Sequence, residues 1–145
     1  MKRFLLPALL LCFSATLTPL YAQVSISVWK RGTSSKVRAL QTELNTILSV
    51  YPTIGLKPEE MLRKRVIDAE NGPFIWCAPM QTTGRQLCTF RIGGVHDDSI
   101  NSWAERITFQ QSQDKTKLLV TRVDAAWKCN EGRGKSDDFH ITVCK

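Results

Sequence analysis

The segment CNEGRGKSDDFHITVC, residues 129–144, holds several side chains that could do chemistry. It could form a metal site, a phosphate-binding loop, or a polar loop closed by a disulfide. A zinc site here would use Cys129, Cys144 and His140, with Asp137 or Asp138 as the fourth ligand. Structural zinc ligands usually come in close pairs such as C-x2-C or H-x3-H, and the segment contains no such pair. The GRGK stretch also lacks the G-x-x-x-x-G-K-[ST] spacing of a phosphate loop, so we expect neither a metal nor a cofactor here.

A disulfide between the two ends of this segment would hold nine polar residues, Asn130–Asp138, as a closed loop. A loop that is ordered in advance loses less conformational entropy when it binds a partner. Arg133 and Lys135 would offer hydrogen-bond donors to a carboxylate of that partner, with the planar guanidinium as the more specific donor. The sequence therefore predicts a recognition loop, with a plain solvated turn as the alternative.

The first 22 residues, MKRFLLPALLLCFSATLTPLYA, have the pattern of an export signal. Lys2 and Arg3 precede an apolar stretch, and the small residue Ala22 marks the expected cleavage point. The apolar stretch is about ten residues long, whereas a membrane-spanning helix needs about twenty. We therefore expect residues 23–145 to form a single exported domain, periplasmic or secreted, with no transmembrane span after cleavage.

Cysteine usage agrees with export. Five cysteines become four without the signal, namely Cys77, Cys88, Cys129 and Cys144. An even number in a small exported chain indicates disulfides, and four cysteines allow three pairings. Both local pairs flank turn signals, so we predict the bridges Cys77–Cys88 and Cys129–Cys144. In the chain-entropy model, loops of this length are each worth roughly 3 kcal/mol.

A second group of reactive residues, the HDDS stretch at 96–99, could supply a base with an orienting carboxylate, or oxygen ligands for a hard cation. Adjacent side chains rarely point the same way, and the preceding Gly93-Gly94 marks a turn, where Asp normally bonds its own backbone. The sequence also provides no partner nucleophile for His96. We therefore assign no catalytic residues and expect a protein that is not an enzyme, with a small secreted hydrolase as the minor alternative.

The chain is basic, with a net charge of +7 that becomes +5 without Lys2 and Arg3. A positive surface favours an acidic partner. Basic residues gather at Arg63–Arg65, which would form either a solvated helix face or a contact for an anionic envelope surface. Nucleic-acid sites interleave aromatic residues with such charge, so nucleic acid is not the expected partner. Trp29 lies on the serine-bearing face of the first expected strand and is a candidate binding anchor.

Helical patterns occupy the first half of the mature chain. Apolar residues along one stripe predict a helix over residues 36–51, capped by Ser34 or Ser35 and ended by Pro52. The PEE stretch that opens residues 58–69 has the composition of a first helical turn. A second helix is therefore predicted from there to about residue 69.

Strand patterns occupy the remainder of the mature chain. Strands are predicted at residues 24–29, 74–80, 87–92, 103–110, 118–127 and 139–143. A turn is expected at residues 30–32, and a hairpin turn at 81–85 would bring Cys77 opposite Cys88. In the long strand over residues 118–127, we expect one face to carry Leu119, Val123, Ala125 and Trp127.

Two helices followed by an antiparallel meander indicate an α+β fold, with both helices packed on one face of a sheet of about five strands. This disulfide-stapled outline is similar to that of cystatin-like or NTF2-like sheets. Small size, two bridges and the missing catalytic set favour an exported binding protein, such as an inhibitor or immunity protein that acts on an acidic protein partner. An accessory factor of a secretion, pilus or conjugation system is the alternative.

Overall fold

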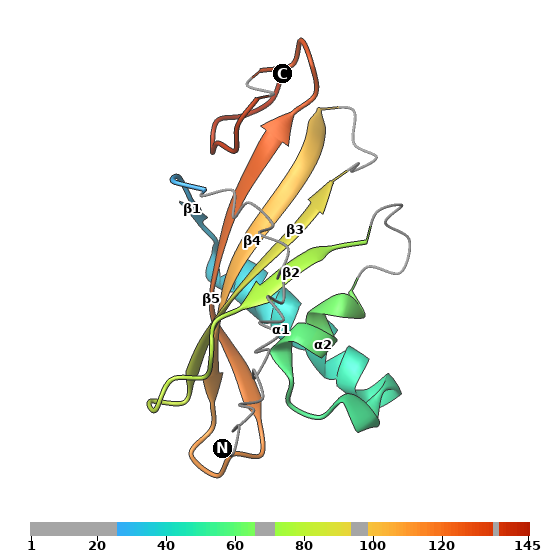
Figure 1. The fold of residues 1–145 in the computed structure, drawn as a ribbon, viewed down its shortest axis with the longest axis vertical. Coiled ribbons are helices and arrows are strands. Elements are labelled where there is room, and N and C mark those ends of the chain that lie inside the picture. Colours follow the sequence, from blue (N-terminus) through green and yellow to red (C-terminus); the bar gives the residue numbers. More distant parts are fainter. Residues whose placement is uncertain (1–25, 66–71, 94–98, 135–136) are drawn as a thin grey trace, which may run out of the picture.

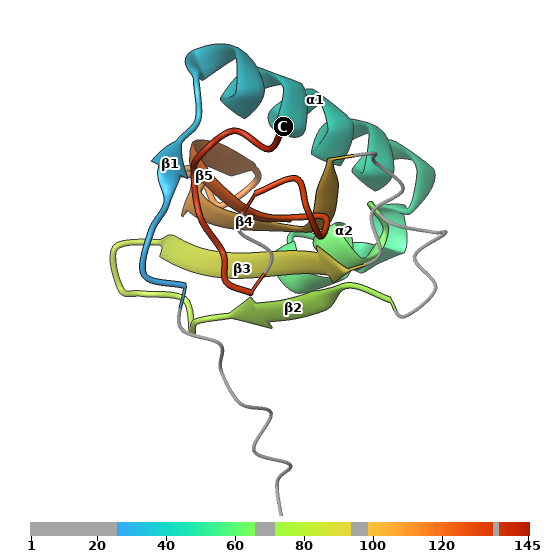
Figure 2. The ribbon, with the colours of Figure 1, turned by 90° about the horizontal axis from the view of Figure 1, so that it is seen from above.

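The computed structural model describes residues 26–65, 72–93, 99–134 and 137–145. Its elements are β1 (Lys30–Arg31), α1 (Ser34–Val50), the 3-10 helix η1 (Pro52–Ile54), α2 (Pro58–Arg63), β2 (Phe74–Cys77), β3 (Arg85–Gly93), β4 (Ile100–Gln111) and β5 (Leu118–Cys129). The strands form one antiparallel sheet in the order β1-β5-β4-β3-β2, with both helices against one face (Figures 1 and 2). This confirms the α+β plan. The predicted signal at residues 1–22 lies outside the described residues. Within the described part, no helix is long and apolar enough to cross a bilayer.

Helix α1 begins two residues before its predicted start and has a different cap. The Oγ1 of Thr33 accepts a hydrogen bond from the backbone N–H of Lys36 at 3.3 Å, so the cap is Thr33, and the prediction of Ser34 or Ser35 was wrong. The helix ends at Val50, where Pro52 cannot continue the backbone hydrogen-bond ladder.

Helix α2 has the predicted start but is shorter than predicted. Pro58 stands in its first turn with Glu59 and Glu60, and the helix ends at Arg63. The backbone N–H of Arg65 then bonds the carbonyl of Leu62, a tight closing turn that points Arg65 back toward the sheet. Residues 66–69, the last part of the predicted helix, lie outside the described residues.

The main hydrophobic core lies between the helices and the sheet. Leu40 and Leu44 of α1 and Met61 and Leu62 of α2 are buried there. The strands add Cys88, Phe90, Ile107, Phe109, Leu118, Val120 and Val123. We call this side of the sheet the inner face. At one end of it, the rings of Trp103 and Trp127 stack with centroids 5.5 Å apart.

Both predicted disulfides are present. Cys77 lies directly opposite Cys88 in the β2–β3 pair, with the Cα atoms 4.0 Å apart. Cys129, the last residue of β5, is bonded to Cys144, with a Cα separation of 5.5 Å. The second bridge ties the C-terminal segment to the end of β5. Figure 1 shows this segment in red beyond the end of that strand.

The first strand differs from the prediction. Residues 26–29 form no strand, and β1 is instead Lys30–Arg31, where a turn was expected. Ile26 and Trp29 pack across the sheet face opposite the helices instead of pairing with its edge. The chain then enters α1 through Gly32, whose N–H donates to the Val123 carbonyl at 2.7 Å. A Cβ on this glycine would lie 2.6 Å from that oxygen, so the close approach requires glycine.

A bulge changes which side chains of β5 are buried. Arg122 pairs with Thr108, but the next pair joins Val120 to Phe109, which leaves Thr121 as the extra residue. Leu118 and Val120 therefore share the inner face with Val123, whereas Leu119 is 42% exposed. The prediction that placed Leu119 on the face of Val123 was wrong because an extra residue reverses the alternation.

The predicted last strand at residues 139–143 is not formed. His140 makes an isolated antiparallel bridge with Trp127, and no strand follows it in residues 137–145. Phe139 is buried, while Val143 is 84% exposed.

Candidate binding face of the sheet

The sheet face opposite the helices carries exposed aromatic rings beside arginines. Residues directly opposite one another in antiparallel strands point to the same face. Phe74 is opposite Arg91, and Trp76 is opposite Thr89, which in turn is opposite Arg106. We call this side the outer face and define it by Arg31, Phe74, Trp76, Arg85, Leu87, Thr89, Arg91, Ala104, Arg106, Thr108, Leu119, Arg122, Asp124, Ala126 and Lys128.

Three large apolar side chains gather at the β2 edge of the outer face. Trp76 is 43% exposed, Phe74 38% and Leu87 37%. Their strands are neighbours, and same-face side chains there lie roughly 5–8 Å apart. Single exposed apolar residues are ordinary on protein surfaces, but a contiguous group marks a candidate contact site.

The charges of the outer face are predominantly positive. Asp124 is the sole carboxylate among the strand residues that define it, and it is buried. Its oxygens accept from Arg106 Nη2 at 2.9 Å and Arg122 Nε at 2.8 Å. Burial favours a higher pKa for Asp124, but the two guanidiniums outweigh burial and hold its pKa below the ordinary value. One carboxylate shared by two arginines leaves the surface cationic.

Aromatic rings hold several of these cations in place. The Arg106 guanidinium lies 4.9 Å from the Trp29 ring centroid, and Arg91 lies 5.7 Å from that of Phe74. The Lys128 ammonium lies 5.3 Å from the ring of Phe139. Cations above aromatic faces gain electrostatic attraction, and a side chain fixed in advance loses less entropy on binding.

Trp29, the predicted anchor, lies on the outer face but is engaged within the protein. Its Nε1–H donates to the Ile26 carbonyl at 2.9 Å, and its ring packs against Ala104 and Ala126. The side chain is half-buried. In the structure, the Trp29 ring supports the Arg106 guanidinium. Direct binding of a partner by Trp29 stays a prediction.

The bridged segment 129–144 borders the outer face. Phe139 packs onto Ala104 and Ala126, which brings the end of the loop against the sheet. Arg133 is exposed, and its Nη1 donates to the carbonyl of Lys145 at 3.4 Å. Lys135 lies outside the described residues. The recognition role of Arg133 and Lys135 is therefore still a prediction.

The basic stretch Arg63–Arg65 does not form one cationic surface. Arg63 pairs with Glu59 at 2.6 Å, and the Lys64 ammonium lies 4.8 Å from the Tyr51 ring centroid. Arg65 turns inward. Because its charges are divided in this way, this helix is a weaker candidate for contact than the outer face.

A buried ion cluster joins the helices to the inner face. Glu105 accepts from Arg65 at 2.7 Å and lies 3.3 Å from the Lys36 ammonium, while Arg65 also contacts Glu43 at 3.0 Å. Burial would raise the pKa of Glu105, but Arg65 and Lys36 outweigh it and hold the pKa below its ordinary value. A carboxylate held ionised between two cations is a poor proton donor, so the cluster is structural.

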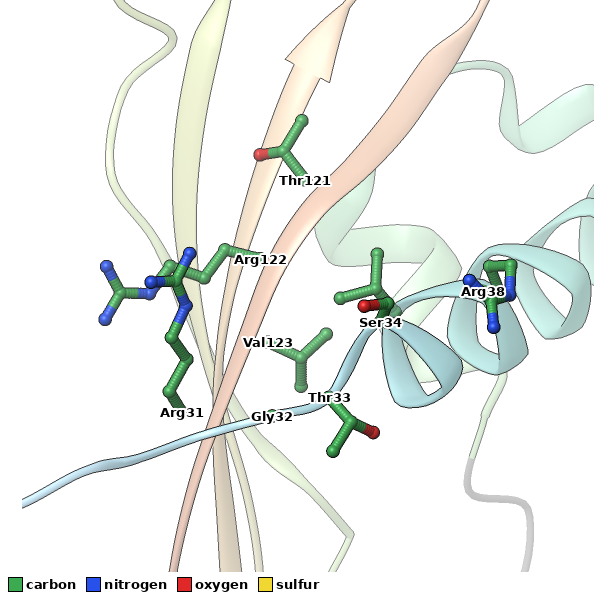
Figure 3. Close-up of a pocket in the computed structure, with 9 residues that line it drawn as sticks. Arg31, Gly32, Thr33, Ser34, Arg38, Thr121, Arg122 and Val123 are labelled. Carbon is green, nitrogen blue, oxygen red and sulfur yellow. The ribbon is translucent and has the colours of Figure 1, made fainter.

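A cavity of about 560 Å³ lies where β1 leads into α1. It is lined by Arg31, Gly32, Thr33, Ser34, Val37, Arg38, Thr121, Arg122 and Val123. Figure 3 shows Arg31 and Arg122 extending to the same side of the strands, while Arg38 lies on the helix. The cavity therefore extends the cationic surface to the β1 edge of the outer face.

The side chains considered for zinc do lie close together. Suitable atoms of Cys129, His140 and Cys144 are within 4.8 Å of one another. The two cysteines are bonded to each other, however, and zinc binds thiolates. The other reactive stretch, residues 96–99, falls outside the described residues except for Ser99.

No family model matches the chain, and no curated protein or solved structure is similar enough to match it. Sequence reasoning missed Phe74, Trp76 and Arg91. The sequence did contain a signal for the two aromatic residues. Side chains alternate between the two faces along a strand, so Cys77, which is bridged to the buried Cys88, places Ile75 on the inner face. Phe74 and Trp76 must then point to the outer face.

Proposed function

We propose that the protein is a small exported binding protein, an inhibitor or immunity protein, whose outer face binds an acidic protein partner. The observation that carries the proposal is the exposed pair Phe74 and Trp76 on β2, with Arg91 directly opposite Phe74. Farther along the same face, Arg106 and Arg122 share the buried carboxylate of Asp124. Tryptophan and arginine are enriched among the residues that dominate binding energy at protein interfaces.

The chemistry of this face suits carboxylates presented by a protein. A guanidinium can bind a carboxylate through two parallel hydrogen bonds, which gives geometric specificity. Arg91, Arg106 and Arg122 lie on three neighbouring strands, about 5 Å apart per strand. The aromatic rings at the β2 edge would supply the desolvated contact area beside them. An anionic envelope surface would use the charge but has less need of these rings.

We also propose the cystatin-like or NTF2-like arrangement for the fold. A long helix that crosses one face of an antiparallel sheet supports it. An accessory role in a secretion, pilus or conjugation assembly would use the same surface, and the identity of the partner separates the two functions.

The test uses residues 23–145 as bait against envelope extracts, followed by titration of the captured partner. We expect an acidic protein, and we expect Trp76→Ala combined with Arg91→Ala to weaken binding about 100-fold or more. Tyr51→Ala combined with Arg63→Ala likewise removes one aromatic ring and one arginine, but on the helix side, and should alter affinity less than about twofold.

Two results would contradict the proposal. One is unchanged affinity in the outer-face variant with a loss in the helix-side control. The other is capture by anionic lipid vesicles or nucleic acid at similar strength and with no dependence on Trp76.

A further inference from the structure

The Cys129–Cys144 bridge is chemically asymmetric. Cys129 is 1% exposed, whereas Cys144 is only half-buried, with the exposed residues Val143 and Lys145 on either side. Gly134 packs against the buried sulfur so closely that a Cβ on the glycine would lie 2.9 Å from Cys129 Sγ. A thiolate from solvent would therefore reach the sulfur of Cys144 and not that of Cys129.

A histidine contacts the shielded sulfur. His140 Nε2 lies 3.3 Å from Cys129 Sγ, and the ring is buried. The backbone N–H of Thr142 donates to His140 Nδ1 at 3.2 Å. The Thr142 hydroxyl lies 2.8 Å from the same nitrogen. A backbone N–H can only donate, so Nδ1 is the acceptor, and we assign the ring N–H to Nε2, directed toward the sulfur.

We propose that this bridge is a thiol–disulfide exchange site for small anionic thiols of the glutathione class. The thiolate attacks Cys144 Sγ and forms a mixed disulfide there, while the S–S bond breaks and its electron pair leaves with Cys129. The His140 Nε2–H donates to the departing thiolate. A second molecule of the thiol then releases Cys144, giving one oxidised dimer of the small thiol and a reduced protein.

The geometry accelerates the step because the hydrogen bond becomes stronger as it proceeds. A disulfide sulfur is a weak acceptor, but a thiolate is charged, and hydrogen bonds to charged groups are about twice as strong as neutral ones. Lower basicity of the leaving thiolate also speeds exchange. The bridge can undergo this exchange and still stabilise the fold while it is oxidised.

Charge near Cys144 favours an anionic thiol. Lys145 follows the cysteine directly, and Arg133 is tied to it by two contacts, Lys145 N to the Arg133 carbonyl at 2.8 Å and Arg133 Nη1 to the Lys145 carbonyl at 3.4 Å. Cys77–Cys88 serves as an internal comparison. His140, the one histidine in the described part of the chain, lies at the other bridge.

The experiment exposes the folded, oxidised protein to glutathione, traps free thiols by rapid alkylation, and maps the products by mass spectrometry. We expect glutathione on Cys144, and reduction of Cys129–Cys144 at least about tenfold faster than that of Cys77–Cys88. His140→Leu should slow the faster reaction about tenfold, while His140→Gln, which keeps an N–H donor, should retain most of the rate.

Arg133→Ala should slow reduction by glutathione but not by the uncharged thiol 2-mercaptoethanol. Glutathione found on Cys129, equal rates at the two bridges, or an unchanged rate in His140→Leu would overturn the proposal. If His140→Leu does not fold, the test uses the unaltered protein alone. Glutathione on Cys144 together with faster reduction of Cys129–Cys144 than of Cys77–Cys88 would then support the proposal, and either opposite result would overturn it.

Discussion

The Glu105 carboxylate and the Arg65 guanidinium meet at 2.7 Å between the sheet and the helices, where both side chains are largely shielded from solvent. Arg65 follows α2, Glu105 belongs to β4, and Lys36 of α1 completes the contact at 3.3 Å. Three segments that are distant in sequence are thus joined by one carboxylate.

Glu105→Gln should be strongly destabilising. Removing one partner of a buried ion pair typically costs about 3–5 kcal/mol. Because Arg65 keeps its contact with Glu43 at 3.0 Å, we expect a cost at the lower end of that range. Denaturant unfolding of the variant should show this as a lower midpoint with little change in slope. Glu59→Gln is the matched control, because it breaks the exposed Glu59–Arg63 pair and should cost about 0.5 kcal/mol or less. Equal losses of unfolding free energy in the two variants would show that the buried cluster stabilises the protein no more than the exposed pair does.

The stability of the protein should fall on acidification. The pKa values of Glu105 and Asp124 are lowered in the folded protein, so their contribution is present above their unfolded pKa values of about 4 and is lost as the pH falls through the folded values. Unfolding free energies measured from about pH 7 down to about pH 2 should decrease mainly below about pH 4. Glu105→Gln should weaken this dependence.

Gly32→Ala should loosen the junction between β1 and β5. The new methyl group would meet the Val123 carbonyl at 2.6 Å, and backbone atoms cannot move aside as a flexible side chain can. Such overpacking typically costs about 1–3 kcal/mol. Gly72→Ala is the comparison, because Gly72 has φ +63° but open space around it. This substitution should therefore cost only the free energy of holding an alanine in the left-handed backbone conformation, with no steric clash. Hydrogen exchange at the Gly32 amide position and at Lys30 should increase only in the first variant.

Cys144→Ser should lower the melting temperature, because opening the second bridge is expected to cost about 3 kcal/mol. Arg133→Ala with Lys135→Ala should leave folding within about 0.5 kcal/mol and weaken partner binding. Thermal unfolding and a binding titration separate the two effects. Unchanged affinity in the double variant would mean that this loop takes no part in recognition.

Local signals were enough for much of the fold. Two cysteines around a turn signal predicted the Cys77–Cys88 pairing, because a hairpin register follows from its turn. The helix predicted over residues 36–51 and observed at Ser34–Val50 followed from its apolar stripe and from Pro52. These features depend on neighbours in sequence, which a single sequence reports well.

Features set by distant contacts were not predicted. The alternation over residues 24–29 resembles a strand, but Ile26 and Trp29 find their apolar contacts on the outer face instead of pairing with an edge. The bulge at Thr121 depends on the register with Thr108, which no property of residues 118–127 alone specifies. The grouping of Phe74 and Trp76 with arginines of other strands likewise required the complete sheet.

The stacked rings of Trp103 and Trp127 make the protein its own optical probe. Two indoles stacked with centroids 5.5 Å apart are close enough for their electronic transitions to couple, and we expect a paired positive and negative band in circular dichroism. Trp76, by contrast, is exposed and should respond to a dissolved fluorescence quencher. The dichroism couplet would therefore report separation of β4 from β5, while quencher protection of Trp76 would report coverage of the outer face, and neither measurement needs a label.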